Sequence, residues 1–357
     1  MKIYSSLANK FATSALIVSA LFSCSESEEI INDLDPDFEV PTTYVFDNVD
    51  YSGQTARIQM LDSLERYIKS GNDGLTNLEE SVMQSVFANE SGTLFGSSKD
   101  LESKTYGEAG LTVDVKTEVY AYFKSAEEAS GNAANIYEGR LFDAEGHEPA
   151  QMVAKGLMGA TLYYQAVSYY LSNEKLDADN EEITEGKGTA MEHYWDEAFG
   201  YFGAAVDYPL NADAKNWYWA KYAKSRADVY DVSGDIFTAF LTGRAAITAK
   251  NYTVRDAQRD IIVAKWEELV AINVIHYLNS VLTDTTDGDR MHHWSEALAF
   301  AWCLQYNASK KISDADLDKV IAAHGNNVDE LTTENIIEIK NILQSTYGFS
   351  AEVVNAL

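Results

Sequence analysis

Apolar residues recur through most of the chain at spacings of three and four, which places them on one face of an α-helix. The clearest stripes lie in segments 148–173 and 261–282, and few prolines interrupt the chain after residue 41. One short candidate strand occupies residues 42–46. The pattern predicts an all-α protein. The expected helices lie near residues 53–70, 76–90, 111–130, 148–173, 188–203, 213–232, 234–250, 253–282, 290–307, 313–324 and 328–345.

Two similar stretches in different halves of the chain indicate an internal repeat. Residues 193–199 read His-Tyr-Trp-Asp-Glu-Ala-Phe, and residues 292–298 read His-His-Trp-Ser-Glu-Ala-Leu. The shared pattern is His-x-Trp-x-Glu-Ala-apolar, and each copy follows an expected long helix. The repeat predicts two related, four-helix-like bundles packed side by side, the first over residues 51–210 and the second over residues 211–357.

The first residues have the features of a cleavable export signal. Two lysines precede an apolar stretch, residues 11–22, which is too short to span a bilayer. The stretch ends at Ser23 and Cys24, which resemble the site where a cysteine is lipidated and becomes the first residue of the mature chain. We expect residues 1–23 to be a signal peptide and Cys24 to anchor the protein to a membrane. An ordinary secretory signal with a chance cysteine is the alternative.

Charge and cysteine content narrow the possible functions. Residues 24–50 are acidic and contain two prolines, so we expect a flexible tether. The whole chain has 56 acidic and 27 basic residues, a net charge of −29, which argues against nucleic-acid binding because phosphate contacts dominate that affinity. The acidic balance is compatible with cation binding or simply with solubility. With Cys24 lipidated, Cys303 has no disulfide partner and is expected to be a buried, inert thiol.

The first candidate site lies at an expected helix start. His147 and Glu148 precede Pro149, which suits the first helical turn, and Gln151 follows. His147 would lie at the mouth of a bundle, where it is a candidate metal ligand. Plain helix capping, with Glu148 at the positive end of the helix, is the alternative.

The second candidate site is a pair of residues on one helix face. His193 and Glu197 are four positions apart, and Glu192 and Asp196 form a second pair with the same spacing. An imidazole and a carboxylate so placed can share one divalent or ferric ion. A buried, hydrogen-bonded histidine or a salt-linked pair on the helix is the alternative.

The third candidate site repeats the second. His292 and Glu296 have the same spacing, and His293 adds another imidazole. Recurrence favours a shared role, although a repeated packing motif would recur in the same way. The matched Trp195 and Trp294 are expected to anchor the helices in the core. The sequence lacks a His-Glu-x-x-His zinc helix, a Gly-x-Ser-x-Gly elbow and a phosphate loop, so an enzyme is not favoured.

Three stretches resemble a known family of bacterial lipoproteins. They are residues 50–57, residues 155–160 and residues 191–202, the last reading Met-Glu-His-Tyr-Trp-Asp-Glu-Ala-Phe-Gly-Tyr-Phe. From about residue 40 to the C-terminus the chain is similar to lipoproteins with domain of unknown function 4856, which look like distant relatives of imelysin. The resemblance implies an all-helical, imelysin-like fold of two related four-helix bundles, export or lipid anchoring, and an association with iron uptake.

The imelysin signature is Gly-x-His-x-x-Glu, and this chain departs from it. Its nearest stretch begins Gly146-His147, so the histidine comes one residue early, and Gln151 stands where a glutamate is expected. The resemblance therefore implies the fold, and it does not carry a peptidase role to His147.

These observations lead to three functional hypotheses. We expect an extracytoplasmic, lipid-anchored binding protein that captures iron, a haem-like compound or another metal species beside an outer-membrane receptor. A non-catalytic interaction scaffold is the alternative, and a metallopeptidase is a further one. The acidic run after Cys24 resembles a signal for export to the outer face of the outer membrane, so the cell surface is the expected location, with the periplasmic face as the alternative.

Overall fold

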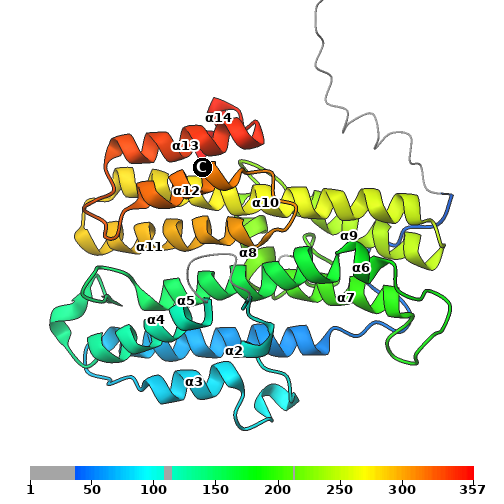
Figure 1. Ribbon diagram of the computed structural model, residues 1–357, viewed down its shortest axis with the longest axis horizontal. Helices are drawn as coiled ribbons and strands as arrows, with labels where there is room; N and C mark the ends of the chain where they lie inside the picture. The colour runs from blue at the N-terminus through cyan, green and yellow to red at the C-terminus, as the bar shows by residue number, and fades with distance from the viewer. Residues whose placement is uncertain (1–36, 108–114, 212–213) are drawn as a thin grey trace, which may run out of the picture. The chain divides into compact units, whose positions relative to one another are not determined.

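The regular structure in the computed structural model is almost entirely helical (Figure 1). The structure describes residues 37–107, 115–211 and 214–357. The predicted signal peptide, Cys24 and the first part of the tether lie outside these residues. Within the described ranges, no helix combines the length and the apolar character needed to cross a bilayer.

Helices of the first half begin where the sequence places suitable residues. Pro149 occupies the first turn of one helix, where its missing N–H costs no hydrogen bond. Thr189 and Glu192 form a capping box at the start of another. The elements are α2 (Ser52–Lys69), η1 (Ser70–Asp73), α3 (Glu80–Ala88), η2 (Leu94–Gly96), η3 (Glu102–Lys104), α4 (Val115–Ala129), η4 (Ala133–Asn135), β1 (Ile136–Tyr137), β2 (Arg140–Leu141), α5 (Pro149–Leu157), the π-helix η5 (Met158–Tyr170), α6 (Asn173–Leu176) and α7 (Ala190–Phe202).

The second half contains the longest helix, and in five of its described helices a side-chain oxygen caps the N-terminus. Such oxygens accept hydrogen bonds from backbone N–H groups that have no partner within the helix. The elements are α8 (Tyr218–Arg226), α9 (Ser233–Thr248), α10 (Tyr252–Thr283), α11 (Asp287–Cys303), η6 (Leu304–Tyr306), α12 (Asp314–His324), α13 (Thr333–Tyr347) and α14 (Ala351–Ala356).

The all-α prediction is confirmed, whereas the expected strand at residues 42–46 is wrong. The two short strands β1 and β2 pair with each other, and residues 42–46 are irregular. Instead of forming a strand, this segment is attached to the helical core through an apolar side chain. Tyr44 is buried, its ring stacks on Phe199 with 3.6 Å between centroids, and its hydroxyl donates a hydrogen bond to Asp196 Oδ1 at 2.7 Å.

Helix packing joins the two halves of the chain. Helix α10 packs against α9 and α11, α11 packs against α5, and α5 packs against α2 and α4 (Figure 1). Helix α7 packs against η5 and α9, and α12 packs against α11 and α13. One cluster of buried apolar side chains extends through these helices without a break at residue 210. The division into two bundles, 51–210 and 211–357, stays a prediction.

The two tryptophans of the repeat anchor their helices in the same way. Trp195 and Trp294 are completely buried. The Trp195 indole N–H donates to the Phe240 carbonyl at 3.0 Å, and the Trp294 indole N–H donates to the His324 carbonyl at 2.9 Å. Each bond satisfies a buried donor while the ring fills the core. Their predicted role as core anchors is confirmed.

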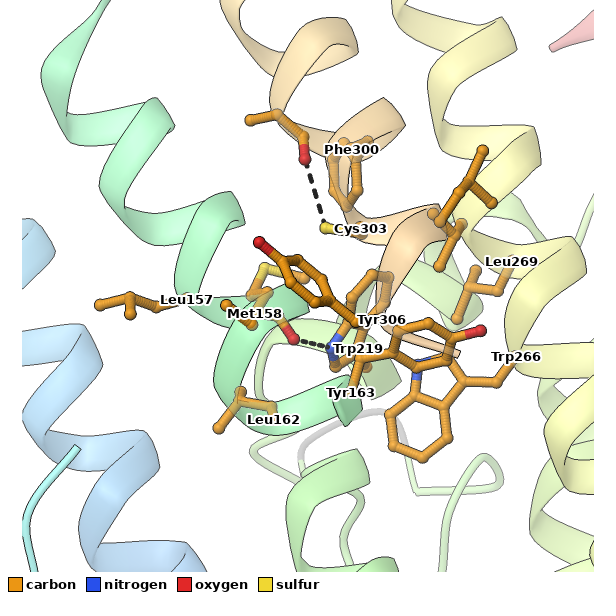
Figure 2. Packing of buried hydrophobic residues seen from close by; sticks show 14 of the residues in the cluster. Leu157, Met158, Leu162, Tyr163, Trp219, Trp266, Leu269, Phe300, Cys303 and Tyr306 are labelled. Atoms are coloured by element: carbon orange, nitrogen blue, oxygen red, sulfur yellow. Dashed lines mark hydrogen bonds between the residues drawn. The ribbon is translucent and has the colours of Figure 1, made fainter. Parts of the chain in front are cut away.

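The helix expected at 148–173 changes from α to π winding at Met158. Figure 2 shows the core around this change, where the Trp219 indole N–H donates to the Met158 carbonyl at 2.9 Å. Helix η5 passes very close to α11, because a Cβ added to Gly159 would lie 2.5 Å from Cys303 Sγ. The Cys303 thiol donates to the Ala299 carbonyl at 3.2 Å, and burial raises the pKa of this thiol. Its prediction as a buried thiol is confirmed.

Candidate functional site

Three polar residues of α5 and its N-cap lie on one helix face. Glu148, Gln151 and Lys155 follow each other at spacings of three and four, which aligns their side chains. All three are buried. They face α11, whose His292 and Glu296 have the same spacing and point toward α5, as the contacts between the two sets show. The two helices thereby enclose a polar cluster inside an otherwise apolar interface.

His292 lies between two carboxylates in this cluster. Its Nδ1 is 2.5 Å from Glu148 Oε2, and its Nε2 is 3.2 Å from Glu296 Oε2. Each ring nitrogen of His292 therefore faces a carboxylate oxygen from a different helix element. The Glu148 backbone N–H donates to Ser295 Oγ at 3.0 Å, which fixes the start of α5 against α11.

Lys155 and Glu296 form a buried ion pair beside His292. Lys155 Nζ lies 2.9 Å from Glu296 Oε1, and the side chains are 6% and 5% exposed. Lys155 also donates to Gln151 Oε1, and its ammonium lies 5.5 Å from the centroid of the Tyr222 ring. Burial alone would lower the pKa of Lys155, but the Glu296 carboxylate raises it. Burial alone would raise the pKa of Glu296, but Lys155 and then His292 lower it. Both partners are therefore charged.

The ion pair forms one wall of a cavity of about 590 Å³, which we call the α5–α11 cavity. Helices α2, α5, α8, α10 and α11 and the residues just before α8 surround it. Its lining residues are Asp62, Glu65, Arg66, Lys69, Gln151, Lys155, Lys215, Asn216, Trp217, Tyr218, Lys221, Tyr222, Tyr277, His292, His293 and Glu296.

His147, the first predicted metal ligand, lies in a turn before α5. Its ring stacks on Trp294 with centroids 4.8 Å apart, and its Nδ1 is 3.3 Å from Asp143 Oδ2. Asp143 Oδ1 also accepts hydrogen bonds from the backbone N–H groups of Glu145 and His147. The nearest ligand atoms of Asp143, Glu145 and His147 lie within 4.8 Å of one another. This turn is the group of described residues that comes closest to a three-ligand set.

The second predicted site forms a separate cluster. His193 Nε2 lies 3.9 Å from Glu197 Oε2, and the Glu197 carboxylate accepts hydrogen bonds from Gln54 Nε2 at 2.8 Å and Tyr170 OH at 3.2 Å. His193 Nδ1 is buried and has no hydrogen-bond partner among the described residues. The i,i+4 pair therefore exists, but its carboxylate is largely committed to neighbouring helices.

Glu192 and Asp196 hold a buried arginine. Arg244 donates from Nη1 to Glu192 Oε1 at 2.6 Å and from Nε to Asp196 Oδ1 at 3.0 Å. Burial raises the pKa of Asp196 to about 7, even though Arg244 and the Tyr44 hydroxyl favour its charged form. Burial alone would also raise the pKa of Glu192, but Arg244 and hydrogen bonds from neighbouring residues lower it. One arginine therefore does not compensate both carboxylates equally. Both acids tie α7 to α9.

His293 points to a different partner than His292 does. Its Nδ1 lies 2.8 Å from Asp284 Oδ2, and its ring stacks on Tyr277 at 5.9 Å. In the described ranges, no set of three His, Cys, Asp or Glu ligand atoms close enough for one ion includes His193, His292 or His293. Metal binding by the repeated pairs stays a prediction.

Residues 41–350 match the model of a family described as a domain of unknown function (DUF4856). The chain belongs to the DUF4856 family. The predicted resemblance to the DUF4856 family is confirmed, and the match includes every residue of the α5–α11 cavity. Neither a curated protein nor a solved structure shows a significant match to the chain.

Two basic residues of this DUF4856 protein were missed as site residues. Lys155 is a positively charged residue in the middle of a strongly apolar helix, and such a position is a sequence signal that could have identified it. Arg244 likewise follows the apolar run Ala239-Phe240-Leu241 within α9. A buried cation needs a carboxylate nearby, so the sequence could have indicated an ion pair at each of these two positions.

Proposed function

We propose that the chain is a lipid-anchored, extracytoplasmic binding protein whose small-molecule ligand occupies the α5–α11 cavity. The observation that supports this most is the Lys155–Glu296 ion pair in the cavity wall. A buried ion pair adds little net stability, because the cost of removing two charges from water offsets their attraction. Charged groups with shifted pKa values inside a concave site are characteristic of ligand and active sites.

The lining favours binding over catalysis. Its sixteen described residues include no serine, threonine or cysteine, the side chains that most often act as nucleophiles. Both nitrogens of His292 already face carboxylates, so neither is free to serve as a general base. These features support the binding hypothesis and give no support to the metallopeptidase.

The proposal retains the expected cellular setting. Lipid on Cys24 would keep the domain at the outer membrane, with residues after the anchor serving as a tether, and an outer-membrane receptor would be a suitable partner. Uptake of iron or another metal fits this setting. At the cavity itself, a metal held in a small-molecule complex is better supported than a bare ion, because both ring nitrogens of His292 already face carboxylates.

Thermal unfolding of the mature protein with a ligand panel tests the proposal. The panel contains organic acids, phosphate, neutral sugars, amino acids, ferric, ferrous, zinc and copper ions, and haem. The test variant is Lys155→Met/Glu296→Leu. It removes both charges of the ion pair together, so neither partner is left buried without a counter-charge. The control is Lys250→Gln/Glu181→Gln, which removes an exposed ion pair with side chains 50% and 70% exposed.

We expect at least one ligand to raise the Tm of the wild type and the control but not that of the cavity variant, because bound ligand stabilises the native state. If no ligand class raises the Tm, or if the cavity variant responds as the wild type does, the binding proposal fails. The interaction scaffold would then be the better account.

A further inference from the structure

We infer that the ligand of the α5–α11 cavity is a small molecule carrying carboxylate or phosphate groups, an inference that rests on the proposed function. The first observation is the composition of the lining. Five of its sixteen residues are lysine or arginine, whereas the whole chain has 27 such residues among 357. Three of the lining residues are carboxylates, although acidic residues outnumber basic ones by 56 to 27 in the chain. The cavity reverses the charge balance of the protein.

Three other cavities among the described residues do not share this reversal. The cavity beside Glu267 is lined by three carboxylates and two cations. The cavity beside His193 is lined by two carboxylates and one lysine, and the cavity beside Tyr44 is lined by one carboxylate and no cation. A surplus of positive charge thus distinguishes the α5–α11 cavity from these three cavities.

The surplus remains after the ion pairs are assigned. The three carboxylates of the lining each have a basic partner, in the pairs Asp62–Arg66 at 3.0 Å, Glu65–Lys69 at 2.5 Å and Glu296–Lys155 at 2.9 Å. Two lysines remain. Lys215 and Lys221 are exposed, and no carboxylate of the described residues pairs with either.

Lys215 and Lys221 lie next to aromatic residues of the cavity lining. Lys215 Nζ lies 3.4 Å from the centroid of the Trp217 ring, and Lys221 is adjacent to Tyr222 in the lining. Ammonium groups donate up to three hydrogen bonds to carboxylate or phosphate oxygens, and the rings offer apolar area to a carbon skeleton. A bare metal cation would instead meet a surplus of positive charge.

The backbone is strained at the first residue of α8, which also lines the cavity. Tyr218 has a φ of +30°, which is a costly conformation for a bulky side chain. Its hydroxyl donates to Glu65 Oε2 at 3.1 Å, and this bond links α8 to the Glu65–Lys69 pair. Strained residues cluster at ligand sites, where the surrounding structure holds them in place. This observation is independent of the charge count and points to the same wall of the cavity.

Calorimetric titration of the mature protein tests the inference with three probes: citrate, inorganic phosphate and ferric citrate. The test variant is Lys215→Gln/Lys221→Gln. The control is Lys124→Gln/Lys319→Gln, which removes two positive charges from α4 and α12, outside the lining. All four lysines are exposed or paired at the surface, so both variants are expected to fold, and circular dichroism checks this.

We expect the wild type and the control to bind at least one probe. The test variant should bind that probe at least about tenfold more weakly, which corresponds to the loss of one charged hydrogen bond. Binding of citrate alone, phosphate alone or only the iron complex would identify the source of the anionic groups. The inference is wrong if no probe binds or if the test variant retains wild-type affinity. If a neutral or cationic member of the thermal panel stabilises the protein through the cavity while all three probes fail, the binding proposal stands and the anionic class alone is rejected.

Discussion

Replacing Lys155 by methionine should destabilise the fold much more than replacing Lys155 and Glu296 together. The two charged atoms are 2.9 Å apart, and the side chains are 6% and 5% exposed. At an effective dielectric constant of about 20, their attraction amounts to roughly 6 kcal/mol. The desolvation of each ion costs several kcal/mol, so the intact pair contributes little net stability.

Breaking the pair has a different consequence. Lys155→Met leaves Glu296 buried without its ammonium, and loss of one partner of a buried pair typically costs about 3–5 kcal/mol. His292 Nε2 remains 3.2 Å from Glu296 and Tyr222 OH remains 3.5 Å away, so we expect a cost near the lower end, about 3 kcal/mol. Lys155→Met/Glu296→Leu fills similar volume with apolar atoms and should lie within about 1 kcal/mol of the wild type.

Urea denaturation followed by tryptophan fluorescence gives the free energy of unfolding for the wild type, both single variants and the double variant. We expect a coupling free energy of at least about 2 kcal/mol between positions 155 and 296, since groups in direct contact are not additive. A coupling close to zero would mean that the two charges do not interact in the folded protein. The buried ion pair, and the functional argument built on it, would then be refuted.

Three further predictions follow from other parts of the chain. Gly159→Ala should destabilise the protein by about 1–3 kcal/mol, because its Cβ would lie 2.5 Å from Cys303 Sγ. Gly156→Ala, with no atom within 4 Å of the added carbon, should be neutral or slightly stabilising. Equal free energies of unfolding for the two variants in urea denaturation would contradict the close helix contact. Cys303 should resist alkylation by iodoacetamide until the protein unfolds, because its thiol is buried and its pKa is raised, and rapid labelling of the native protein detected by mass spectrometry would contradict this. Asp196 has a pKa raised from 3.8 to about 7, so the folded state retains a proton that the unfolded state loses; the free energy of unfolding of the wild type relative to Asp196→Asn should fall as pH rises from 3.8 to about 7, and a pH-independent difference would rule the shift out.

Most helices could be predicted from the sequence because their apolar stripes and end signals are local. The expected segments near 53–70 and 253–282 correspond to α2 (Ser52–Lys69) and α10 (Tyr252–Thr283) within a residue or two. Residues 42–46 could not be assigned correctly, because the burial of Tyr44 depends on Phe199 and Asp196, which are distant in the sequence. The π winding of η5 likewise depends on packing and leaves no local pattern of its own.

The candidate site was predictable in part. Spacing alone places His292 and Glu296 on one face of a helix, and the structure shows this pair in contact. The same spacing also pairs His193 with Glu197. Of these two glutamates, however, only Glu296 forms an ion pair with a lysine of the described residues, Lys155. The difference lies in what the opposite helix contributes. A repeated motif therefore predicted the repeated geometry, while the chemistry at each copy depended on long-range packing.

A crystal structure of the mature protein with citrate or phosphate at saturating concentration would show whether the α5–α11 cavity binds an anionic small molecule. We expect ligand density within the cavity, with the ligand oxygens in hydrogen-bond contact with Lys215 or Lys221 and the rest of the ligand directed toward Lys155. Ligand density elsewhere on the protein, or an empty cavity at a concentration that saturates binding in solution, would show that the cavity is not the binding site.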